Sequence, residues 1–392
     1  MASSAVLRGV ERPDAWAILP LVWLWGLAAT SAARSGPAPA WAAVLAGALV
    51  RLPLVGTPPW LSDDGYRYLW EGLAANQGIN PFLVPPSAVR GLDDALAARV
   101  NHGDLTSIYP PLALAWFRAN AIFFRDLWGL QLTTAAVDLV TVGVLARVAP
   151  RGYGWVYALH PLAALEAASG AHLEPVAIAA TVGVLTSARG APWLAALGVW
   201  TKLFPVAFWP SLFPGRPWRA ALALLATAIG GVILAAPYLA AGAGLVRSGE
   251  VYARTWEFNG LVWPWLALAL GPGARPLLLL GMAVVAGLAW WRALPPARAW
   301  LWVGTAFVAL GPTAHPWYGL WALVPAIALG RWGWSVAGVS LLGAYGVLSG
   351  LDPATGVWVE PRWLWYVTWI PALAAVGAEL GYRRREETPT AP

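Results

Sequence analysis

The chain has 392 residues, of which 59% are hydrophobic and only 11% are charged, whereas soluble domains carry about 25% charged residues. It contains 28 Trp, 34 Pro and no Cys, which excludes a disulfide-stapled secreted domain and any Cys-ligated metal site. So few charges cannot cover the surface of a soluble protein of this size. The composition therefore predicts an all-α, polytopic membrane protein.

The charge balance indicates which segments face which side of the membrane. Lys and Arg number 25 against 19 Asp and Glu, a net charge of +6. Most Arg residues stand between apolar runs, which favours a role in topology, and no nucleic-acid partner is expected. The segment from Trp60 to Tyr109 reverses the balance, with six acids and three Arg. We expect this acidic loop on the non-cytoplasmic side.

Apolar runs along the chain predict the membrane spans, each of which needs about 20 mostly apolar residues. In chain order the candidates are Ala15–Ala33, Trp41–Gly56, Gln131–Ala146, Tyr153–Ala168, Val176–Ala188, Ala220–Ala241, Pro276–Trp291, Ala299–Gly311, Tyr318–Gly330, Trp332–Gly350 and Trp363–Leu380. Pro110–Phe124 and Pro192–Phe213 are ambiguous, so we expect about 11 spans, within a range of about 9 to 13. The first run follows Arg8 and Arg12 like a signal peptide, but further spans follow at once, so an uncleaved helix is expected.

The orientation follows from the C-terminus, because Arg383, Arg384 and Arg385 stand just past the last span and should be cytoplasmic. Alternation then places on the same side Arg331, Arg298, Arg292, Arg219, Arg216 and Arg189, and on the outer side Leu351–Arg362, the loop of His315 and Gly242–Arg275. The segment Pro192–Phe213 lies between two basic ends and contains Pro205 and Pro210, which break helices. We therefore expect a re-entrant hairpin bordering a cavity. Upstream of residue 150 the orientation stays open.

The domain organisation is simple. Residues 1–381 are expected to form a single integral membrane domain, with the acidic outward loop over residues 60–110 and short interfacial helices within it. Residues 382–392 are expected to form a short, charged and disordered cytoplasmic tail.

The strongest local pattern is the string LSDDGYRYLWEG, which begins at Leu61 directly after a predicted span. One interpretation is that Ser62 or Asp63 caps an interfacial helix, where acidic residues suit the helix dipole. The other is a substrate pocket, because the pair Asp63 and Asp64 heads the acidic loop. That loop continues into the turn-forming motifs Asn80-Pro81-Phe82 and Asn101–Pro111.

These motifs resemble the GT-C superfamily of integral membrane glycosyltransferases, and are most similar to bacterial polyprenyl-phosphate-mannose-dependent mannosyltransferases. The resemblance rests on DDGYRYLWEG, GINPF and the stretch ending in IYPP, followed in order by HPL with Glu166, GAHLE, TKLFP, EFNG and HPWY. It covers roughly residues 55 to 325. His160 stands where the family usually has Asn, and Glu174 is one residue displaced from the usual Asp.

The resemblance implies transfer of a sugar, mannose above all, from a polyprenyl-phosphate carrier to a hydroxyl of a glycan or lipid acceptor. The reaction is expected on the non-cytoplasmic face of a multi-pass plasma membrane protein. It implies that a first-loop acid is the catalytic base, here Asp63 or Asp64. Neighbouring helical side chains diverge by about 100°, so we expect only one to be the base and slightly favour Asp63.

The resemblance also implies a set of substrate-binding residues. These are Arg67, Tyr68, His102, Tyr109, Glu166, His172, Lys202, Glu257, Asn259, His315 and Tyr318. Lys202 and Arg67 are the candidates for the lipid phosphate, although Lys202 alternatively snorkels to the interface and Arg67 alternatively pairs with Asp63 or Asp64. The His residues show no metal-ligand spacing, and divalent-metal dependence varies across the superfamily, so the metal stays open.

A second function class is a transporter or flippase of a lipid-linked or small polar substrate. Asp138 in an apolar run and the Pro-broken segment at Lys202 favour it. The acidic loop and the lack of a visible inverted repeat favour the enzyme, because transporters place polar residues on broken helices at the midplane.

Overall fold

The computed structural model describes residues 15–37, 39–186, 191–350 and 359–387. Among these residues the structure is helical, apart from isolated bridges that Phe258 and Asn259 make with Thr313. Several sequence-based expectations fall outside the described residues, namely those on Arg8, Arg12, Arg189, most of the outer loop 351–362, and the chain end 388–392.

Eighteen α-helices and several shorter helical turns make up the described chain. The helices are α1 (Ala15–Ser31), α2 (Ala40–Arg51), α3 (Asp64–Asn76), α4 (Asp94–Ala97), α5 (Pro111–Phe123), α6 (Leu127–Val148), α7 (Tyr153–Leu159), α8 (Pro161–Ala164), α9 (Leu173–Thr181), α10 (Ala191–Thr201), α11 (Pro217–Leu234), α12 (Gly244–Thr255), α13 (Trp263–Leu270), α14 (Ala274–Trp291), α15 (Pro296–Leu310), α16 (Leu320–Ala328), α17 (Trp332–Leu341) and α18 (Arg362–Glu387). The turns that bear on the site are the π-helical η5 (Leu165–Ser169) and the 3-10 turns η7 (Phe204–Leu212), η10 (Pro316–Gly319) and η11 (Leu342–Gly350).

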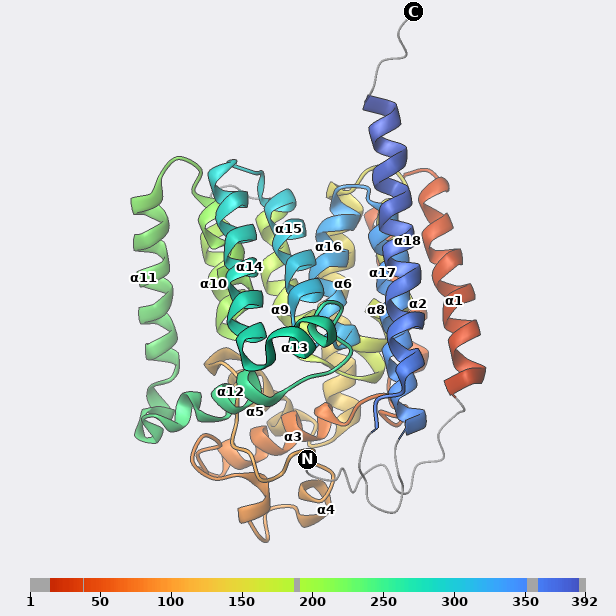
Figure 1. Ribbon diagram of the computed structural model, residues 1–392. Helices are drawn as coiled ribbons and strands as arrows, with labels where there is room; N and C mark the ends of the chain where they lie inside the picture. The colour runs from red at the N-terminus through yellow and green to blue at the C-terminus, as the bar shows by residue number, and fades with distance from the viewer. Residues whose placement is uncertain (1–14, 38, 187–190, 351–358, 388–392) are drawn as a thin grey trace, which may run out of the picture.

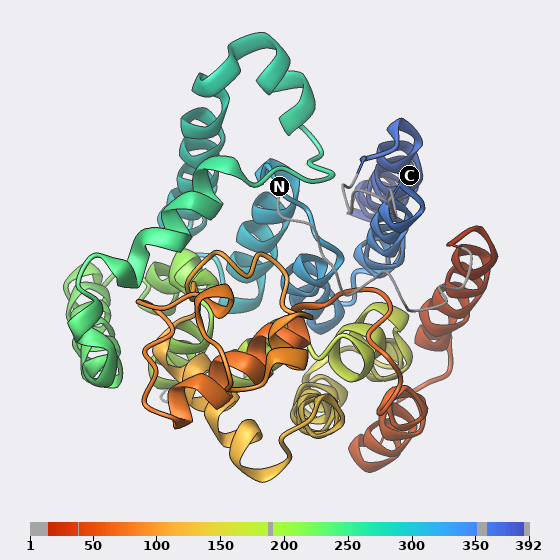
Figure 2. The ribbon, with the colours of Figure 1, turned by 90° about the horizontal axis from the view of Figure 1, so that it is seen from below.

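The long helices stand side by side as a bundle, and the acidic loop covers one end of it. Figure 1 shows α3, α4, α5 and α12 gathered at that end, whereas the C-terminal end of α18 projects from the other. The view along the bundle in Figure 2 shows the segment around α3 lying across the helix ends. The acidic loop and the C-terminal Arg residues therefore lie at opposite ends of the molecule, as the predicted orientation requires.

Several Arg-containing loops lie together at the end of the bundle from which the C-terminal end of α18 projects. Gly152, with φ of +81°, lies so close to the backbone of Ala33 that a Cβ would collide with it. Gly330 packs on Pro150, and both Arg331 and Arg383 pair with Glu379. The neighbouring Arg34, Arg151 and Arg331 thus share one end, the pattern that the positive-inside rule gives for a cytoplasmic face.

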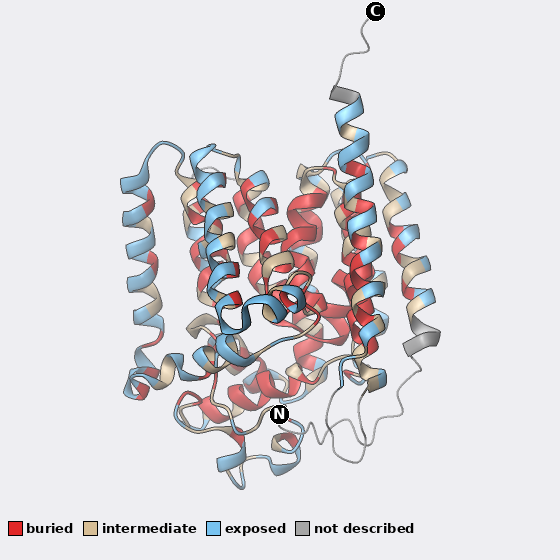
Figure 3. Ribbon diagram, viewed as in Figure 1, coloured by how far each residue is buried: buried red, intermediate tan, exposed pale blue. Residues whose placement is uncertain are grey.

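Burial differs strongly between helices, as Figure 3 shows. In α6, 56% of the apolar window is buried, against 6% in α11, whose Leu and Ile side chains face outward. Among the described residues four stretches are long and apolar enough to cross a membrane, or five if the helices of residues 161–169 and 173–185, bent by 114°, form one span. The described residues of the predicted spans are mostly helical, and the number of about 11 spans stays a prediction.

The two ambiguous segments are both helical. Pro110–Phe124 contains α5, which packs on α3. Pro192–Phe213 is broken at Lys202 and Leu203 into α10 and η7, which pack against each other. A break next to Pro205 agrees with its missing amide donor, and the re-entrant path through the membrane stays a prediction.

The expected disorder of the tail after Gly381 is wrong for the described residues, because α18 continues to Glu387. Arg383 donates to Glu379 one turn earlier and to the carbonyl of Gly330. An (i, i+4) ion pair and cations in a last turn both stabilise a helix end. The Arg-rich tail therefore extends the last helix through residue 387.

Candidate active site

The two carboxylates of the first motif stand where α3 begins. Asp63 occupies the N-cap position and Asp64 the first helical residue. The Asp63 side chain does not cap the helix; instead the backbone amide of Asp64 donates weakly to Ser62 Oγ at 3.4 Å. The capping interpretation thus holds for the position of Asp63 and not for its carboxylate.

Both carboxylates converge on one amide, although we expected them to diverge. Asn101 Nδ2 lies 2.7 Å from Asp63 Oδ1 and 2.7 Å from Asp64 Oδ1. The divergence of about 100° between neighbouring side chains holds only within a helix, and Asp63 has the non-helical backbone of an N-cap. Asn101 joins the end of the acidic loop to its beginning.

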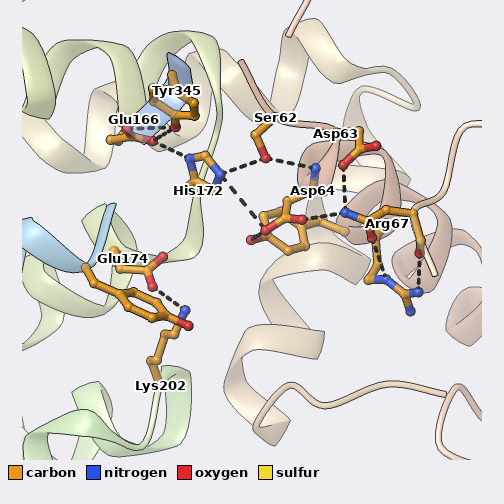
Figure 4. A network of polar contacts seen from close by, with 12 residues as sticks. Ser62, Asp63, Asp64, Arg67, Glu166, His172, Glu174, Lys202 and Tyr345 are labelled. Atoms are coloured by element: carbon orange, nitrogen blue, oxygen red, sulfur yellow. Dashed lines mark hydrogen bonds and ion pairs between the residues drawn. The ribbon is translucent and has the colours of Figure 1, made fainter. Parts of the chain in front are cut away.

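Asp64 faces a buried network that comes from the bent pair of helices (Figure 4). His172 Nε2 lies 3.1 Å from Ser62 Oγ and 4.0 Å from Asp64 Oδ2. His172 Nδ1 lies 2.6 Å from Glu166 Oε2, and the Tyr345 hydroxyl donates to both oxygens of Glu166. The predicted residues Glu166 and His172 therefore lie together beside Asp64.

The electrostatics keep Asp64 ionised. Burial raises the pKa of its carboxyl, but the charge of His172 and the hydrogen bond from Asn101 outweigh burial and hold the pKa below the ordinary value of 3.8. The Asp64 side chain keeps 21% of its surface exposed. A carboxylate that is ionised and still reachable can accept a proton.

Lys202 lies across the site from α3. Its ammonium pairs with Glu174, the residue at the start of α9, and stands 5.5 Å from the centre of the Tyr318 ring. The Tyr318 hydroxyl is 2.6 Å from that of Tyr252 on α12. Lys202 keeps 25% of its side chain exposed, so an ammonium with three donors has room for an anionic ligand.

An aromatic stack joins the HPWY stretch to the network. Trp317 stacks on His172 with ring centres 4.0 Å apart and on His315 at 4.3 Å. His315 also stacks on Phe258 at 5.0 Å. Burial lowers the pKa of His315 to about 3, so the ring is neutral. His315 and Tyr318 thus border the same site as Lys202.

Arg67 holds the acidic loop, and its predicted role as a phosphate ligand stays a prediction. Its guanidinium donates to the side chain and carbonyl of Asn101, to the carbonyls of His102 and Leu105, and to Glu71. Glu71, one turn further along α3, is a carboxylate partner of Arg67 at 3.2 Å. These contacts let Arg67 shape the loop.

The remaining first-loop candidates line the same end of the bundle. His102 has φ of +46° and packs edge-on against Trp256; burial, with the charge of Arg67, lowers its pKa. The Tyr68 hydroxyl lies 3.5 Å from Asp64 Oδ2, and Tyr68 contacts Tyr109 edge to face. Tyr68 is therefore beside the carboxylate, and Tyr109 supports it from behind.

The EFN stretch divides into one surface residue and one buried residue. Glu257 keeps 52% of its side chain exposed and pairs with Arg275. Asn259 is buried with φ of +48°, and its side-chain amide has no hydrogen-bond partner among the described residues. Its carbonyl accepts from Trp369.

Three further observations concern the transporter interpretation, the open question of a metal, and His160. Asp138, which favoured a transporter, is bound through both oxygens by Arg51 and Tyr157. Among the described residues no group of three or more His, Asp or Glu is arranged to hold a metal ion. His160 is a core residue that bonds the carbonyl of Ser335.

The sequence analysis missed Asn101 and Tyr345 as parts of the site. Asn101 is the first residue of the motif that contains His102. Its position could have indicated a role, since a polar turn residue in the acidic loop needs a hydrogen-bond partner. Tyr345 lies in an apolar run, where its buried hydroxyl requires an acceptor; the acceptor, Glu166, is 179 residues away.

Comparison with known proteins finds a mannosyltransferase. The chain is 24% identical over 355 residues to a probable α-(1→6)-mannopyranosyltransferase of Mycolicibacterium smegmatis. The match covers 71% of this chain and 63% of that relative, so the chain spans less than two thirds of the relative's length. No protein-family description and no solved structure matches the chain. The resemblance to mannosyltransferases noted from the motifs is confirmed by this similarity.

Proposed function

We propose that the chain transfers a mannosyl group from a polyprenyl-phosphate carrier to a hydroxyl of a glycan or lipid acceptor. The observation that carries the proposal is the position of Asp64. Its carboxylate is held ionised and partly exposed, with the buried Glu166–His172 pair on one side and Lys202 near enough to lower its pKa further. A similarity to a probable mannopyranosyltransferase supports the sugar.

The chemistry divides between these groups. Asp64 accepts the proton of the acceptor hydroxyl while the hydroxyl oxygen forms a bond to the anomeric carbon. The bond from that carbon to the phosphate oxygen breaks, and its electron pair leaves with the lipid phosphate. Lys202, a cation at the edge of the site, stabilises that phosphate. The geometry favours Asp64 over Asp63 as the base, which reverses the preference drawn from sequence.

The proposed location is the non-cytoplasmic face of a plasma membrane. The acidic loop and α3, which begins at Asp64, lie at the bundle end opposite the C-terminal end of α18 (Figure 1), and basic loops face the cytoplasm. Residues 1–381 then act as one membrane glycosyltransferase domain, with the donor and the membrane lipids reaching the site from the bilayer.

The test uses purified protein in lipid vesicles with a panel of radiolabelled polyprenyl-phosphate sugars. Wild-type protein is expected to bind one donor saturably and to hydrolyse it slowly, and Asp64→Asn is expected to bind it without turnover. Asp104→Asn, an exposed acid of the same loop, is the matched control and should keep wild-type turnover. Failure of the wild-type protein to bind any lipid-linked sugar would overturn the proposal.

A further inference from the structure

A continuous chain of polar contacts runs inward from Asp64. It passes from Asp64 Oδ2 to His172 Nε2 at 4.0 Å, from His172 Nδ1 to Glu166 Oε2 at 2.6 Å, and from Glu166 to the Tyr345 hydroxyl at 2.9 Å. The side chains of His172 and Glu166 are 0% and 1% exposed. A substrate outside Asp64 therefore cannot reach the inner members, and the substrate-binding role predicted for Glu166 and His172 does not explain their burial.

The backbone is shaped to place these two residues. Glu166 lies on the π-helical turn η5, and His172 is the N-cap of α9 after the 114° bend. Ala171 between them has φ of +50°, a conformation that costs an L-residue energy. The His172 ring is clamped in its plane by Trp317. Single π-turns and strained residues recur at functional sites because packing must maintain them.

We propose that Glu166 and His172 form a proton relay behind Asp64, an inference that rests on the proposed transfer reaction. Asp64 takes the proton of the acceptor hydroxyl as the new glycosidic bond forms and the phosphate leaves with the electrons of the broken bond. The proton then moves to Nε2 of the neutral His172 ring, which leaves Asp64 ionised, and the Glu166 carboxylate stabilises the imidazolium through Nδ1–H. After the product departs, the proton returns through Asp64, the exposed end of the chain of contacts, to water, and the His172 ring is again neutral.

The 4.0 Å separation between Asp64 and His172 fits a free enzyme, because catalytic hydrogen bonds tighten when substrate binds. Ser62 Oγ, 3.1 Å from His172 Nε2, holds the ring in the meantime. Tyr345 is a positioning residue, since it bonds both Glu166 oxygens and touches no group of the outer site in Figure 4. The charged and titratable groups facing the pair are Asp64, Glu174, Lys202 and His315.

The decisive experiment measures turnover against pH for His172→Gln, Glu166→Gln and Tyr345→Phe in the full-length protein in vesicles. The first two variants should lose about 10²-fold in kcat with a donor KM within about threefold of wild type. In wild type, kcat should fall as the pH falls through the pKa of His172, because the protonated ring cannot accept a proton, and this limb should be absent from His172→Gln. Tyr345→Phe should lose about tenfold or less in kcat.

The matched control is His160→Asn, a buried His replaced by the residue usual in similar mannosyltransferases. It lies outside the relay, so its pH profile should match wild type. A folded, donor-binding His172→Gln whose kcat keeps the same acidic limb as wild type would overturn the relay. Absence of transfer by wild-type protein would instead overturn the reaction itself.

A second measurement is independent of turnover. Nitrogen-15 NMR of the labelled His172 ring, at a pH above its pKa, should show Nδ1 carrying the proton in wild type and not in Glu166→Leu, which lacks the acceptor. The same tautomer in both proteins would contradict the role of Glu166 even if a variant loses activity through misfolding.

Discussion

The Arg51–Asp138 pair and the Asp64–His172–Glu166 network both bury charge in an apolar bundle, but they differ in how they end. Arg51 and Asp138 are 1% and 0% exposed, and Tyr157 and the carbonyl of Ala158 complete their bonding. The second network ends at Asp64, which keeps 21% of its side chain exposed and carries a single strong bond from Asn101.

This difference indicates that the Arg51–Asp138 pair stabilises the fold, whereas the Asp64–His172–Glu166 network is available for the reaction. A buried pair whose bonds are complete has nothing left to offer a ligand, and its removal costs stability. In the second network one carboxylate stays partly exposed, so a ligand can still reach its charge. Keeping such a charge in an apolar bundle costs folding free energy. Substitutions in the first cluster should therefore change folding, and those in the second should change turnover.

The largest effect is expected for Asp64→Asn. It should lower kcat by about 10³-fold because the amide cannot accept the acceptor proton, while thermal unfolding in vesicles stays close to wild type. Asp63→Asn, beside it on Asn101, should lose less than about tenfold, since its role is to orient the loop. A more severe loss in Asp63→Asn than in Asp64→Asn would return the catalytic role to Asp63.

The acidic limb of the wild-type kcat/KM profile sharpens the same assignment. Because the folded pKa of Asp64 is below 3.8, the ionised base is present throughout the neutral range and is lost only as pH falls through that lowered pKa. The same sign holds for stability: the contribution of Asp64 is present above the unfolded pKa and disappears on acidification. A limb near neutral pH that persists in His172→Gln would assign the base to another group.

The next effect is on folding. Arg51→Ala leaves the Asp138 carboxylate buried without its cation and should destabilise the protein by about 3–5 kcal/mol, measured by thermal or denaturant unfolding in detergent micelles. The double variant Arg51→Met with Asp138→Leu removes both charges and should recover most of that loss. Molecules of either variant that remain folded should keep wild-type kcat; a large fall in kcat would make this cluster part of the site.

Lys202→Ala should weaken donor binding by about 10- to 100-fold, because a partly exposed ammonium to phosphate bond is worth about 1.5–3 kcal/mol. Donor affinity is measured by equilibrium binding of the radiolabelled lipid in vesicles. Lys202→Arg should retain most of the affinity as the matched control, since it keeps the charge. Unchanged affinity in Lys202→Ala would mean that the lysine only snorkels toward the interface.

Composition alone was sufficient for the helical membrane class, because few charges and long apolar runs leave no other fold. The motifs also predicted a site at Asp64, Glu166, His172, Lys202 and Tyr318, and the structure brings these residues near one another. Periodicity could not indicate that Asn101 bridges two carboxylates 37 and 38 residues before it. Such contacts depend on how the loop closes.

Arg67 shows how much residue type leaves open when tertiary contacts are unknown. A cation one turn after two carboxylates is a reasonable phosphate ligand, yet the loop folds its own carbonyls around the guanidinium. The tail misled for a similar reason. Its charges suggested disorder, but Glu379, two residues before Gly381, gives Arg383 a partner within the helix.

The smallest effect is expected at Glu257, whose motif is among those that suggested the site. Its carboxylate is about half exposed and pairs with Arg275, and exposed pairs are worth about 0.2–1 kcal/mol. Glu257→Gln should therefore change kcat/KM by less than about threefold, whereas Asn259→Ala, at the buried end of the same loop, should raise the donor KM more. Steady-state kinetics on both variants measure this contrast. A loss of turnover at Glu257 as large as that at Asp64 would mean that the loop closes onto the substrate, and that exposure in the free protein is a poor guide to the site.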